Sequence, residues 1–197
     1  MYTVIGGVGS RTFRVLWMLE ELGATYEHIP ARPWSEEVLA HNPSGKIPVL
    51  IDDGVALTDS TAILTYLADK HGALTYPAGS LDRARQDGIT CAILDELDAV
   101  LWTAARHSFV LPEDQRVPAV KDSLKAEYAR NSLRLTERIA GPFFIGEMMT
   151  IPDIIMTHCC NWAISAKFPE PEPPLAQYLS NMRARPAFGR ARALGKP

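Results

Sequence analysis

Cysteine is scarce in this sequence, and the few cysteines form no recognisable framework. Three occur among the 197 residues, at Cys91, Cys159 and Cys160, unevenly spaced and without a CxxC pair. An odd number of cysteines without paired spacing is typical of reduced thiols, which favours a cytoplasmic protein over a disulfide-stabilised secreted one. Histidine and cysteine do not cluster at ligand spacing either, so we expect no metal.

A basic surplus, a long apolar run and a secretion signal are also missing. Lys and Arg total 20 against 23 Asp and Glu, for a net charge of -3 at pH 7, whereas a nucleic-acid binder usually shows a basic surplus or stripe. No apolar run approaches the ~20 residues of a membrane span. The first residues, MYTVIGGVGS, lack the basic flank and apolar core of a signal peptide. We therefore expect no nucleic-acid partner, no membrane partner and a cytoplasmic location.

The first third of the chain alternates short strand-like runs with helical patterns, in the order β-α-β-(α)-β-β-α. Glycines after the helical runs are stop signals, and Asp53-Gly54 between two apolar runs predicts a hairpin turn. Strands are predicted over 2–6, 24–31, 47–51 and 55–57, and helices over 11–23 and 60–72. This segment therefore predicts a small α/β domain at residues 1–72.

Strand signals disappear after a stretch rich in small and turn-forming residues, which we interpret as a linker over 73–81. Helical periodicity then predicts helices over about 82–108 and 118–139, a helix beginning at TIPDIIMTHCCNWA, and a basic helical tail. Thr150 is the expected N-cap of the third helix, with Pro152 and Asp153 in its first turn. The sequence thus predicts an all-α second domain over 82–197.

Residues 41–63, HNPSGKIPVLIDDGVALTDSTAI, place a proline directly ahead of an apolar strand. Because proline cannot donate to a sheet, Pro48 marks a strand start, an edge or a bend. A cis Ile47–Pro48 bond is a further option, since only X-Pro bonds reach cis at low cost. Such a turn would leave the N–H and C=O of Ile47 unpaired beside a sheet edge, where an extended peptide could pair with them.

Ser60, at the first turn of the next helix, indicates a second binding feature. The unpaired donors and the dipole of a helix N-terminus amount to about half a positive charge and attract anions, and the Ser60 hydroxyl adds a donor. A small peptide with a free carboxylate fits both features. Alternatively, Ser60 is only a helix cap and Asp59 only a charge favoured by the dipole, while Pro48 is structural in either case.

These motifs resemble the cytosolic glutathione S-transferases over nearly the whole chain. NPSGKIPVL and TDSTAILTYL are similar to the thioredoxin-like half of that family, and FRVLWMLEELGATYE to its first helix and second strand. GEMMTIPDIIM resembles the capping-box segment of its all-α half, and YLSNMRARPAFGRA its C-terminal helix. The resemblance implies a thioredoxin-like domain followed by an all-helical domain, a homodimer, and glutathione as co-substrate.

The resemblance also assigns roles to residues. Ile47 would hold the cysteinyl backbone of glutathione, Ser60 would take its γ-glutamyl carboxylate, and an acidic residue of the partner's long helix, at the position of Asp98, would reach the glutamyl amine. The expected glutathione contacts are Lys46, Ile47, Pro48, Asp59 and Ser60, with Lys46 near the glycyl end.

The catalytic group is expected in the turn GVGSRTFR between the first strand and the first helix. This turn has no Tyr and no Cys, so the tyrosine-type and cysteine-type branches fit poorly. Ser10 is the first choice as donor to the glutathione thiolate, with Arg11 as electrostatic support or as an alternative, and Thr12 as a further candidate. Ser10 could instead be only the N-cap of the first helix. The branch that isomerises maleylacetoacetate carries Ser-Ser-Cys where this chain has Gly9-Ser10-Arg11.

The segment LWTAARHSFVLPED of the helical half is expected to run along the cleft that receives a small hydrophobic electrophile. The predicted pocket residues are Trp102, Arg106, His107 and Phe109, of which His107 has the alternative of being a wall or surface residue. By this resemblance the protein is a glutathione transferase that conjugates the thiol to an electrophile. The alternatives are a glutathione-dependent isomerase, dehalogenase or peroxidase, and a non-catalytic interaction module with the same fold.

Overall fold

The structure, a computed structural model, describes residues 1–195 and divides them into two compact units. The first unit contains residues 1–78 together with the C-terminal segment from Asn181, and the second contains residues 79–180. The elements of the first unit are β1 (Tyr2–Ile5), α1 (Thr12–Leu22), β2 (Tyr26–Ile29), α2 (Glu36–Leu39), β3 (Val49–Asp52), β4 (Val55–Thr58), α3 (Ser60–His71) and α9 (Pro186–Ala193).

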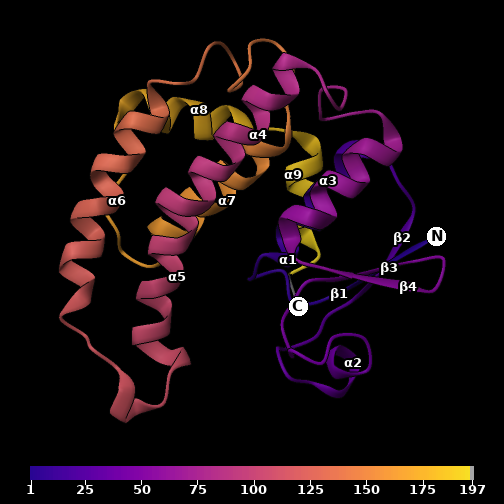
Figure 1. The fold of residues 1–197 in the computed structure, drawn as a ribbon, viewed down its shortest axis with the longest axis horizontal. Helices are drawn as coiled ribbons and strands as arrows, with labels where there is room; N and C mark the ends of the chain where they lie inside the picture. Colours follow the sequence, from indigo (N-terminus) through magenta and orange to yellow (C-terminus); the bar gives the residue numbers. More distant parts are fainter. Residues whose placement is uncertain (196–197) are drawn as a thin grey trace. The chain divides into compact units, whose positions relative to one another are not determined.

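The first unit is built on a four-stranded sheet of order β2-β1-β3-β4, in which β1 and β2 are parallel and the other pairs antiparallel. Helices α1 and α3 lie on one side of this sheet and α2 on the other (Figure 1). Ile5, Val38 and Val49 form the buried cluster on the α2 side. Strands buried on both faces are expected to be apolar throughout, as β1 and β3 largely are. The predicted thioredoxin-like domain is confirmed.

The register of the sheet brings distant segments to one of its ends. Ile5 of β1 pairs with Val49 of β3, and Val49 pairs in turn with Thr58 of β4. The turn after β1, the residues just before β3 and the start of α3 therefore meet at this end of the sheet. These are the segments in which the sequence places the glutathione contacts and the catalytic turn.

The C-terminal helix α9 belongs to the first unit, which differs from the predicted helical domain over 82–197. The Phe188 ring meets the rings of Phe13 and Trp17 edge-on, with centroids 5.2 Å and 5.0 Å apart. Because these α1 side chains offer a buried apolar surface, the last helix packs on α1 and leaves the second unit to end at residue 180. Residues 196–197 of the predicted range lie outside the described residues.

Arginines at this end of the chain make ion pairs with α1. Arg185 donates to both oxygens of Glu21, at 2.6 Å and 2.8 Å, and Arg190 donates to Glu20 at 2.6 Å. Burial opposes ionisation of Glu20, but hydrogen bonds from Tyr26 and Arg190 outweigh it and keep the pKa of this carboxyl below its usual value. The bidentate Arg185 pair adds orientation to the apolar contact of α9.

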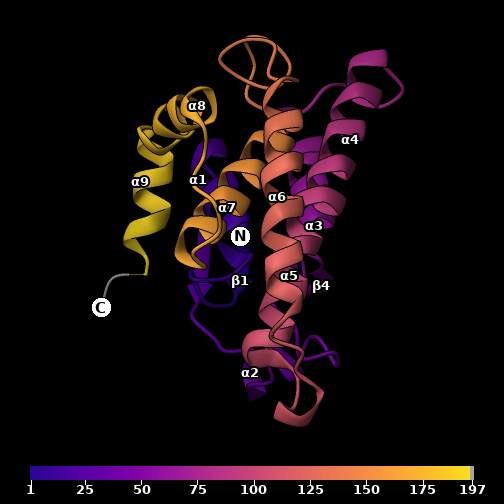
Figure 2. The ribbon, with the colours of Figure 1, turned by 90° about the vertical axis from the view of Figure 1, so that its left-hand side faces the viewer.

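The second unit is helical throughout. Its elements are α4 (Leu81–Ile93), the π-helix η1 (Leu94–Asp98), α5 (Ala99–Ala105), the π-helix η2 (Arg106–Val110), the 3-10 helix η3 (Glu113–Gln115), α6 (Val120–Thr136) and α7 (Ile151–Ser165), while α8 (Pro173–Arg183) crosses the boundary between the units. The single helix predicted over 82–108 is thus one helical path with two π-turns. Helix α5 packs against α6, and α4 against α7 (Figure 2). The predicted all-helical domain is confirmed.

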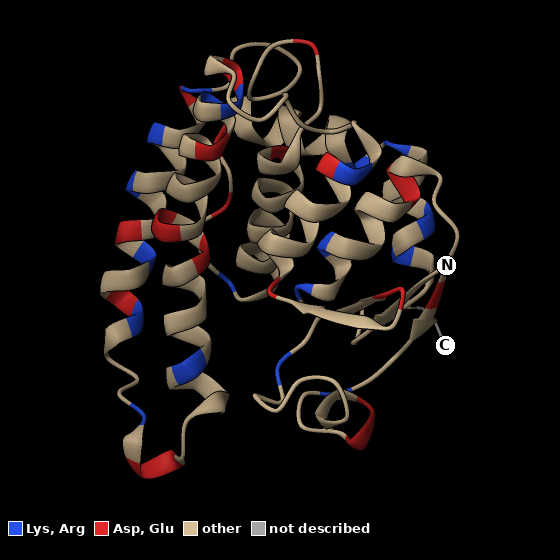
Figure 3. Cartoon of the chain, turned by 45° about the vertical axis from the view of Figure 1, so that its right-hand side comes forward, with Lys and Arg blue, Asp and Glu red and all other residues tan. Residues whose placement is uncertain are grey.

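Helix α7 begins as the sequence predicts. Thr150 is its N-cap and forms a capping box with Asp153, and a proline occupies the first turn. Acidic and basic residues are interspersed along α6 (Figure 3). Within residues 1–195, none of the helices combines the length and the apolarity needed to cross a bilayer.

Candidate functional site

Gly6 joins the predicted catalytic turn to the predicted peptide-pairing residue. Its φ is 142°, and a Cβ placed on it would lie 2.2 Å from Thr12 Oγ1 and 3.0 Å from Ile47 Cβ. No side chain fits there, and the backbone conformation is one that only glycine adopts readily. The turn after β1 and the residue before Pro48 are therefore held in direct contact across Gly6.

Ile47 presents its main chain as the sequence predicts. The Ile47–Pro48 bond is cis, the option raised by the sequence, and Pro48 is buried while Ile47 is half-buried. No hydrogen bond within residues 1–195 uses the N–H or the C=O of Ile47. Main-chain groups normally find partners, so Ile47 offers a donor and an acceptor to an extended peptide lying alongside it.

The loop before Ile47 is shaped by Asn42. Its side-chain amide donates to the Lys46 carbonyl at 2.8 Å, and its side-chain oxygen accepts from the N–H and hydroxyl of Ser44 at 3.1 Å and 2.8 Å. Such side-chain-to-backbone bonds are characteristic of Asx turns. The turn fixes the course of the chain into Ile47 and leaves the Lys46 side chain exposed.

Trp34 is a residue of this end of the sheet that sequence reasoning missed. The residue is 66% exposed and its φ is 68°. Its main-chain N–H donates to the Gly45 carbonyl at 2.9 Å. A Cβ on Gly45 would lie 2.3 Å from the indole, so the ring covers the glycine next to Lys46. A bulky residue with positive φ is a genuine outlier, and such outliers concentrate at functional sites. The residues next to Trp34 in the sequence do not predict its backbone conformation, because its contact partner Gly45 lies later in the chain, beyond α2.

Asp59, and not Ser60, caps helix α3. The Asp59 carboxylate accepts from the N–H groups of Thr61 and Ala62 at 2.8 Å and 3.1 Å. One alternative for Asp59 is a charge favoured by the helix dipole, and the structure shows that this residue is the N-cap itself. Ser60 is therefore not the cap of this helix. Asp59 thus satisfies two donors of the first turn, which leaves Ser60 as the remaining candidate for an anion contact at this helix end.

Ser60 is supported by Arg14, which sequence reasoning also missed. Ser60 is 2% exposed, and its Oγ accepts from Arg14 Nη1 at 3.2 Å. A hydroxyl that accepts one bond keeps its own O–H to donate. The guanidinium is fully buried and brings a positive charge to the end of α3. The sequence signal that could have revealed Arg14 is its position among the apolar residues of α1, next to Val15 and one turn before Met18.

The three catalytic candidates differ in accessibility. Ser10 Oγ accepts from the N–H of Thr12 at 3.1 Å, donates to the Gly7 carbonyl at 2.7 Å and lies 2.9 Å from Thr12 Oγ1. Ser10 therefore stabilises the turn before α1, but the N-cap of that helix is Arg11 and not Ser10, so the capping alternative for Ser10 is wrong. Thr12 is fully buried, whereas Ser10 and Arg11 are half-buried. A ligand can reach Ser10 and Arg11, but not Thr12.

The four predicted electrophile contacts lie on one helical path of the second unit. Trp102 is in α5, and Arg106, His107 and Phe109 are in η2. Phe109 is 69% exposed, while His107 Nδ1 accepts from the N–H of Val117 at 3.1 Å. That bond gives His107 a structural task in holding the following loop.

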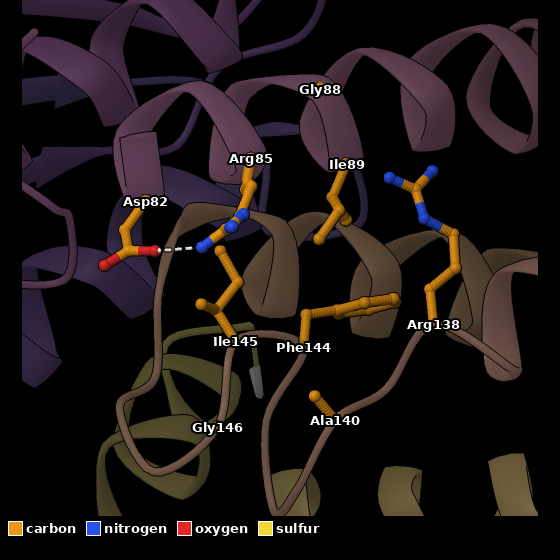
Figure 4. Close-up of a pocket in the computed structure, with 9 residues that line it drawn as sticks. All are labelled: Asp82, Arg85, Gly88, Ile89, Arg138, Ala140, Phe144, Ile145 and Gly146. Carbon is orange, nitrogen blue, oxygen red and sulfur yellow. Dashed lines mark hydrogen bonds and ion pairs between the residues drawn. The ribbon is translucent and has the colours of Figure 1, made fainter. Parts of the chain in front are cut away.

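A cavity of about 510 Å³ in the second unit lies elsewhere on its surface. Arg85 and Arg138 flank Ile89 and Phe144, and Arg85 donates to Asp82 at 2.8 Å (Figure 4). The cavity is lined by Asp82, Arg85, Gly88, Ile89, Arg138, Ala140, Phe144, Ile145 and Gly146. The predicted electrophile contacts do not line it.

Asp98, the expected contact to a partner's ligand, is only 8% exposed. Its carboxylate lies 3.6 Å from the Cys159 thiol, which donates to it. A carboxylate turned into its own unit is not placed to reach a second chain, so this arrangement does not support that transfer.

Comparisons with known proteins agree on one family. A family model described as "Glutathione S-transferase, N-terminal domain" matches residues 10–70. Glutathione S-transferase GstA of Escherichia coli O157:H7 is 30% identical over 157 residues, covering 77% of this chain and 74% of that protein. Maleylacetoacetate isomerase of Rhizobium meliloti is 35% identical over 97 residues, but the match spans only 46% of each chain. A sphingomonad glutathione S-transferase complexed with glutathione superposes with a TM-score of 0.81 at 25% identity, over 98% of both chains.

Proposed function

The chain belongs to the glutathione S-transferase family, and from that premise we propose that it binds glutathione at the shared end of the sheet and transfers its sulfur to a small hydrophobic electrophile. The observation that carries the proposal is the meeting of three features at that end. These are the unused main-chain groups of Ile47, the Arg14-supported hydroxyl of Ser60, and the half-buried Ser10 turn.

In the proposed complex the tripeptide lies extended beside Ile47. The cysteinyl N–H and C=O pair with the C=O and N–H of Ile47, as in addition of a strand to a sheet edge. The γ-glutamyl carboxylate accepts from the Ser60 hydroxyl, with the Arg14 charge behind it. The Asp59 carboxylate lies beside this position and attracts the glutamyl ammonium, and the exposed Lys46 attracts the glycyl carboxylate.

Catalysis requires the bound thiol to ionise. A free thiol of pKa ~8.5 is only about 3% thiolate at pH 7, and lowering that pKa by ~2 units makes it roughly three-quarters thiolate, a gain of ~25-fold. We assign the stabilising donor to the Ser10 hydroxyl and the electrostatic support to Arg11. This makes the chain a serine-type member of its family.

Donation to a thiolate changes the hydrogen bonds of Ser10. Its single proton now goes to the Gly7 carbonyl, and it must rotate to reach the sulfur. A neutral hydrogen bond contributes about 1 kcal/mol net, whereas one to a charged group contributes about 1.5–3 kcal/mol. The exchange is therefore favourable, and the N–H of Thr12 still holds Ser10 Oγ in place.

The chemical step is nucleophilic substitution or addition at carbon. The thiolate lone pair forms a C–S bond, and the bond pair of the leaving group departs with a halide, or passes to an epoxide oxygen or an enone and is then protonated. We propose Trp102, Arg106, His107 and Phe109 as contacts of the electrophile, and a homodimer in a cytoplasmic location as the working form of the protein.

Removing the Ser60 hydroxyl is expected to weaken glutathione binding about 10- to 100-fold, because one hydrogen bond to a carboxylate contributes about 1.5–3 kcal/mol. Isothermal titration of glutathione against Ser60→Ala and wild type measures the change. Ser123→Ala, an exposed serine of α6, is the matched control. An unchanged dissociation constant in Ser60→Ala would remove Ser60 from the site.

Turnover is tested by incubating the protein with glutathione and a panel of aryl halides, epoxides and enones, and identifying products by mass spectrometry. Formation of the thioether faster than in the protein-free control supports the transferase. Saturable binding of glutathione without any product would instead indicate an interaction module.

A glutathione-dependent isomerase is the second candidate, favoured by the 35% identity to the Rhizobium meliloti isomerase. In that reaction the thiolate adds to a cis enone and leaves again, so glutathione is not consumed. The replacement of Ser-Ser-Cys by Gly9-Ser10-Arg11 argues against it. Maleylacetoacetate converted to its trans isomer with glutathione recovered intact would establish this candidate over the transferase.

A further inference from the structure

The second unit contains a cluster of metal-ligating side chains outside the proposed glutathione site. Asp98, His158 and Cys159 each place one ligand atom so that all three atoms lie within 4.8 Å of one another. Asp98 ends the π-helix η1, and the other two residues are neighbours on α7. We propose that Asp98, His158 and Cys159 bind a single divalent transition metal ion of the zinc type.

One contact within the cluster has the spacing of two ligands on one ion. Cys159 Sγ lies 3.6 Å from Asp98 Oδ1. Zinc binds sulfur at ~2.3 Å and carboxylate oxygen at ~2.0–2.2 Å, so tetrahedral geometry separates two such ligands by about 3.5 Å. The ligand nitrogen of His158 lies within 4.8 Å of the ligand atoms of Asp98 and Cys159, so all three can contribute to one ion.

The type of donor selects the metal. A thiolate and an imidazole favour zinc, cobalt or copper over calcium and magnesium, which prefer oxygen ligands. Thiolate and carboxylate together carry two negative charges, which a divalent cation balances in a buried setting where an unbalanced charge is costly. Asp98 and Cys159 are both buried. Three protein ligands leave the fourth position of a tetrahedral ion for water or an added ligand.

The surroundings of His158 help to hold its ring in place. Its Nδ1 is buried, and its ring meets the Trp162 ring edge-on with centroids 6.4 Å apart. His158 is half-buried as a whole residue, while the cluster that it forms with Asp98 and Cys159 is buried. The π-turn at η1 adds one residue to a helical turn, and such turns are frequent at functional sites.

No metal was expected from the sequence, because ligand spacing was sought among His and Cys alone. The third ligand comes from a position 61 residues before Cys159, and only the packing of η1 on α7 brings the two together. Without metal, the same geometry is a buried thiol that donates a hydrogen bond to Asp98. The two states differ in whether the thiol keeps its proton.

The test is titration of the full chain, stripped with a chelator, with zinc chloride and cobalt chloride. We expect about one metal ion per chain, proton release on binding, and thiolate-to-cobalt charge-transfer absorption. Cys159→Ser is expected to weaken binding at least about 100-fold and to abolish that absorption, since loss of a supporting group around a metal alone costs about 10- to 100-fold. Cys160→Ser and Cys91→Ser, each removing a thiol outside the cluster, are expected to bind as wild type does.

A second variant guards against a misfolded Cys159→Ser protein. His158→Gln alters a half-buried position, and zinc is expected to raise the melting temperature of wild type and Cys160→Ser but not of His158→Gln. Failure of wild type to bind zinc stoichiometrically would overturn the proposal. So would equal zinc binding in wild type, Cys159→Ser and His158→Gln, or loss of binding in Cys91→Ser.

Discussion

Ser10→Ala is expected to raise the pKa of enzyme-bound glutathione by about 1–2 pH units, because the thiolate loses one hydrogen bond of about 1.5–3 kcal/mol. The lowered thiol pKa means that thiolate is present above that pKa and is lost as the pH falls through it. The conjugation rate should therefore fall about 3- to 25-fold at pH 7 and by less than about 2-fold at pH 9, where both proteins hold mostly thiolate. The ultraviolet absorbance of the bound thiolate, followed against pH, measures the shift directly.

The pH profile separates this role from a structural one. A variant that merely loosened the turn before α1 would lose activity at both pH values, whereas loss of the thiolate donor is repaired at high pH. Ser123→Ala is the control, since its serine lies on α6 and is exposed. Equal pKa values of bound glutathione in wild type and Ser10→Ala would contradict the assignment and move the role to Arg11, the other accessible candidate.

Asp153→Ala is expected to produce the largest loss of stability, about 3–5 kcal/mol, because it leaves several buried donors without an acceptor. One carboxylate oxygen accepts from the Phe144 N–H at 3.0 Å and the Tyr178 hydroxyl at 2.8 Å. The other accepts from the Thr150 N–H at 2.8 Å and its hydroxyl at 3.1 Å. The capping box of α7 is lost in the same substitution. Urea unfolding followed by circular dichroism measures the change.

Asp122→Ala is the matched control for this prediction. Asp122 also stands in the first turn of a helix, α6, but it is exposed, and its replacement is expected to cost at most about 1 kcal/mol through the helix dipole. Equal shifts of the urea midpoint in Asp153→Ala and Asp122→Ala would contradict the prediction, because the buried hydrogen bonds of Asp153 would then add nothing to the free energy of unfolding.

Local chemistry explains why much of the first unit was predictable. Proline, glycine and the Asp-Gly turn set the ends of the strands around Pro48 and Gly54. Strands that alternate with helices can be connected in only a few ways. The capping residues Thr150 and Asp153 were predictable for the same reason, since their interactions lie within one helical turn. Asp59 could have been recognised as a cap, because Asp is a preferred N-cap residue.

What the sequence did not reveal depends on contacts between distant segments. Arg14 appears as an isolated charge in an apolar helix until α3 is packed against it. Helix α9 has the composition of a solvated tail, and only the rings of Phe13 and Trp17 show where Phe188 is buried. The position of the Trp34 ring likewise depends on its contact with Gly45. Both residues lie in loops, where the periodicity of apolar residues predicts nothing.

The most direct test is a crystal structure of the protein with saturating glutathione. We expect the cysteinyl N–H and C=O within about 3.2 Å of the main-chain O and N of Ile47, the γ-glutamyl carboxylate at the same distance from Ser60 Oγ, and the sulfur beside Ser10. Glutathione bound at another place, or no density along Ile47 while the ligand is at saturation, would contradict the proposed site.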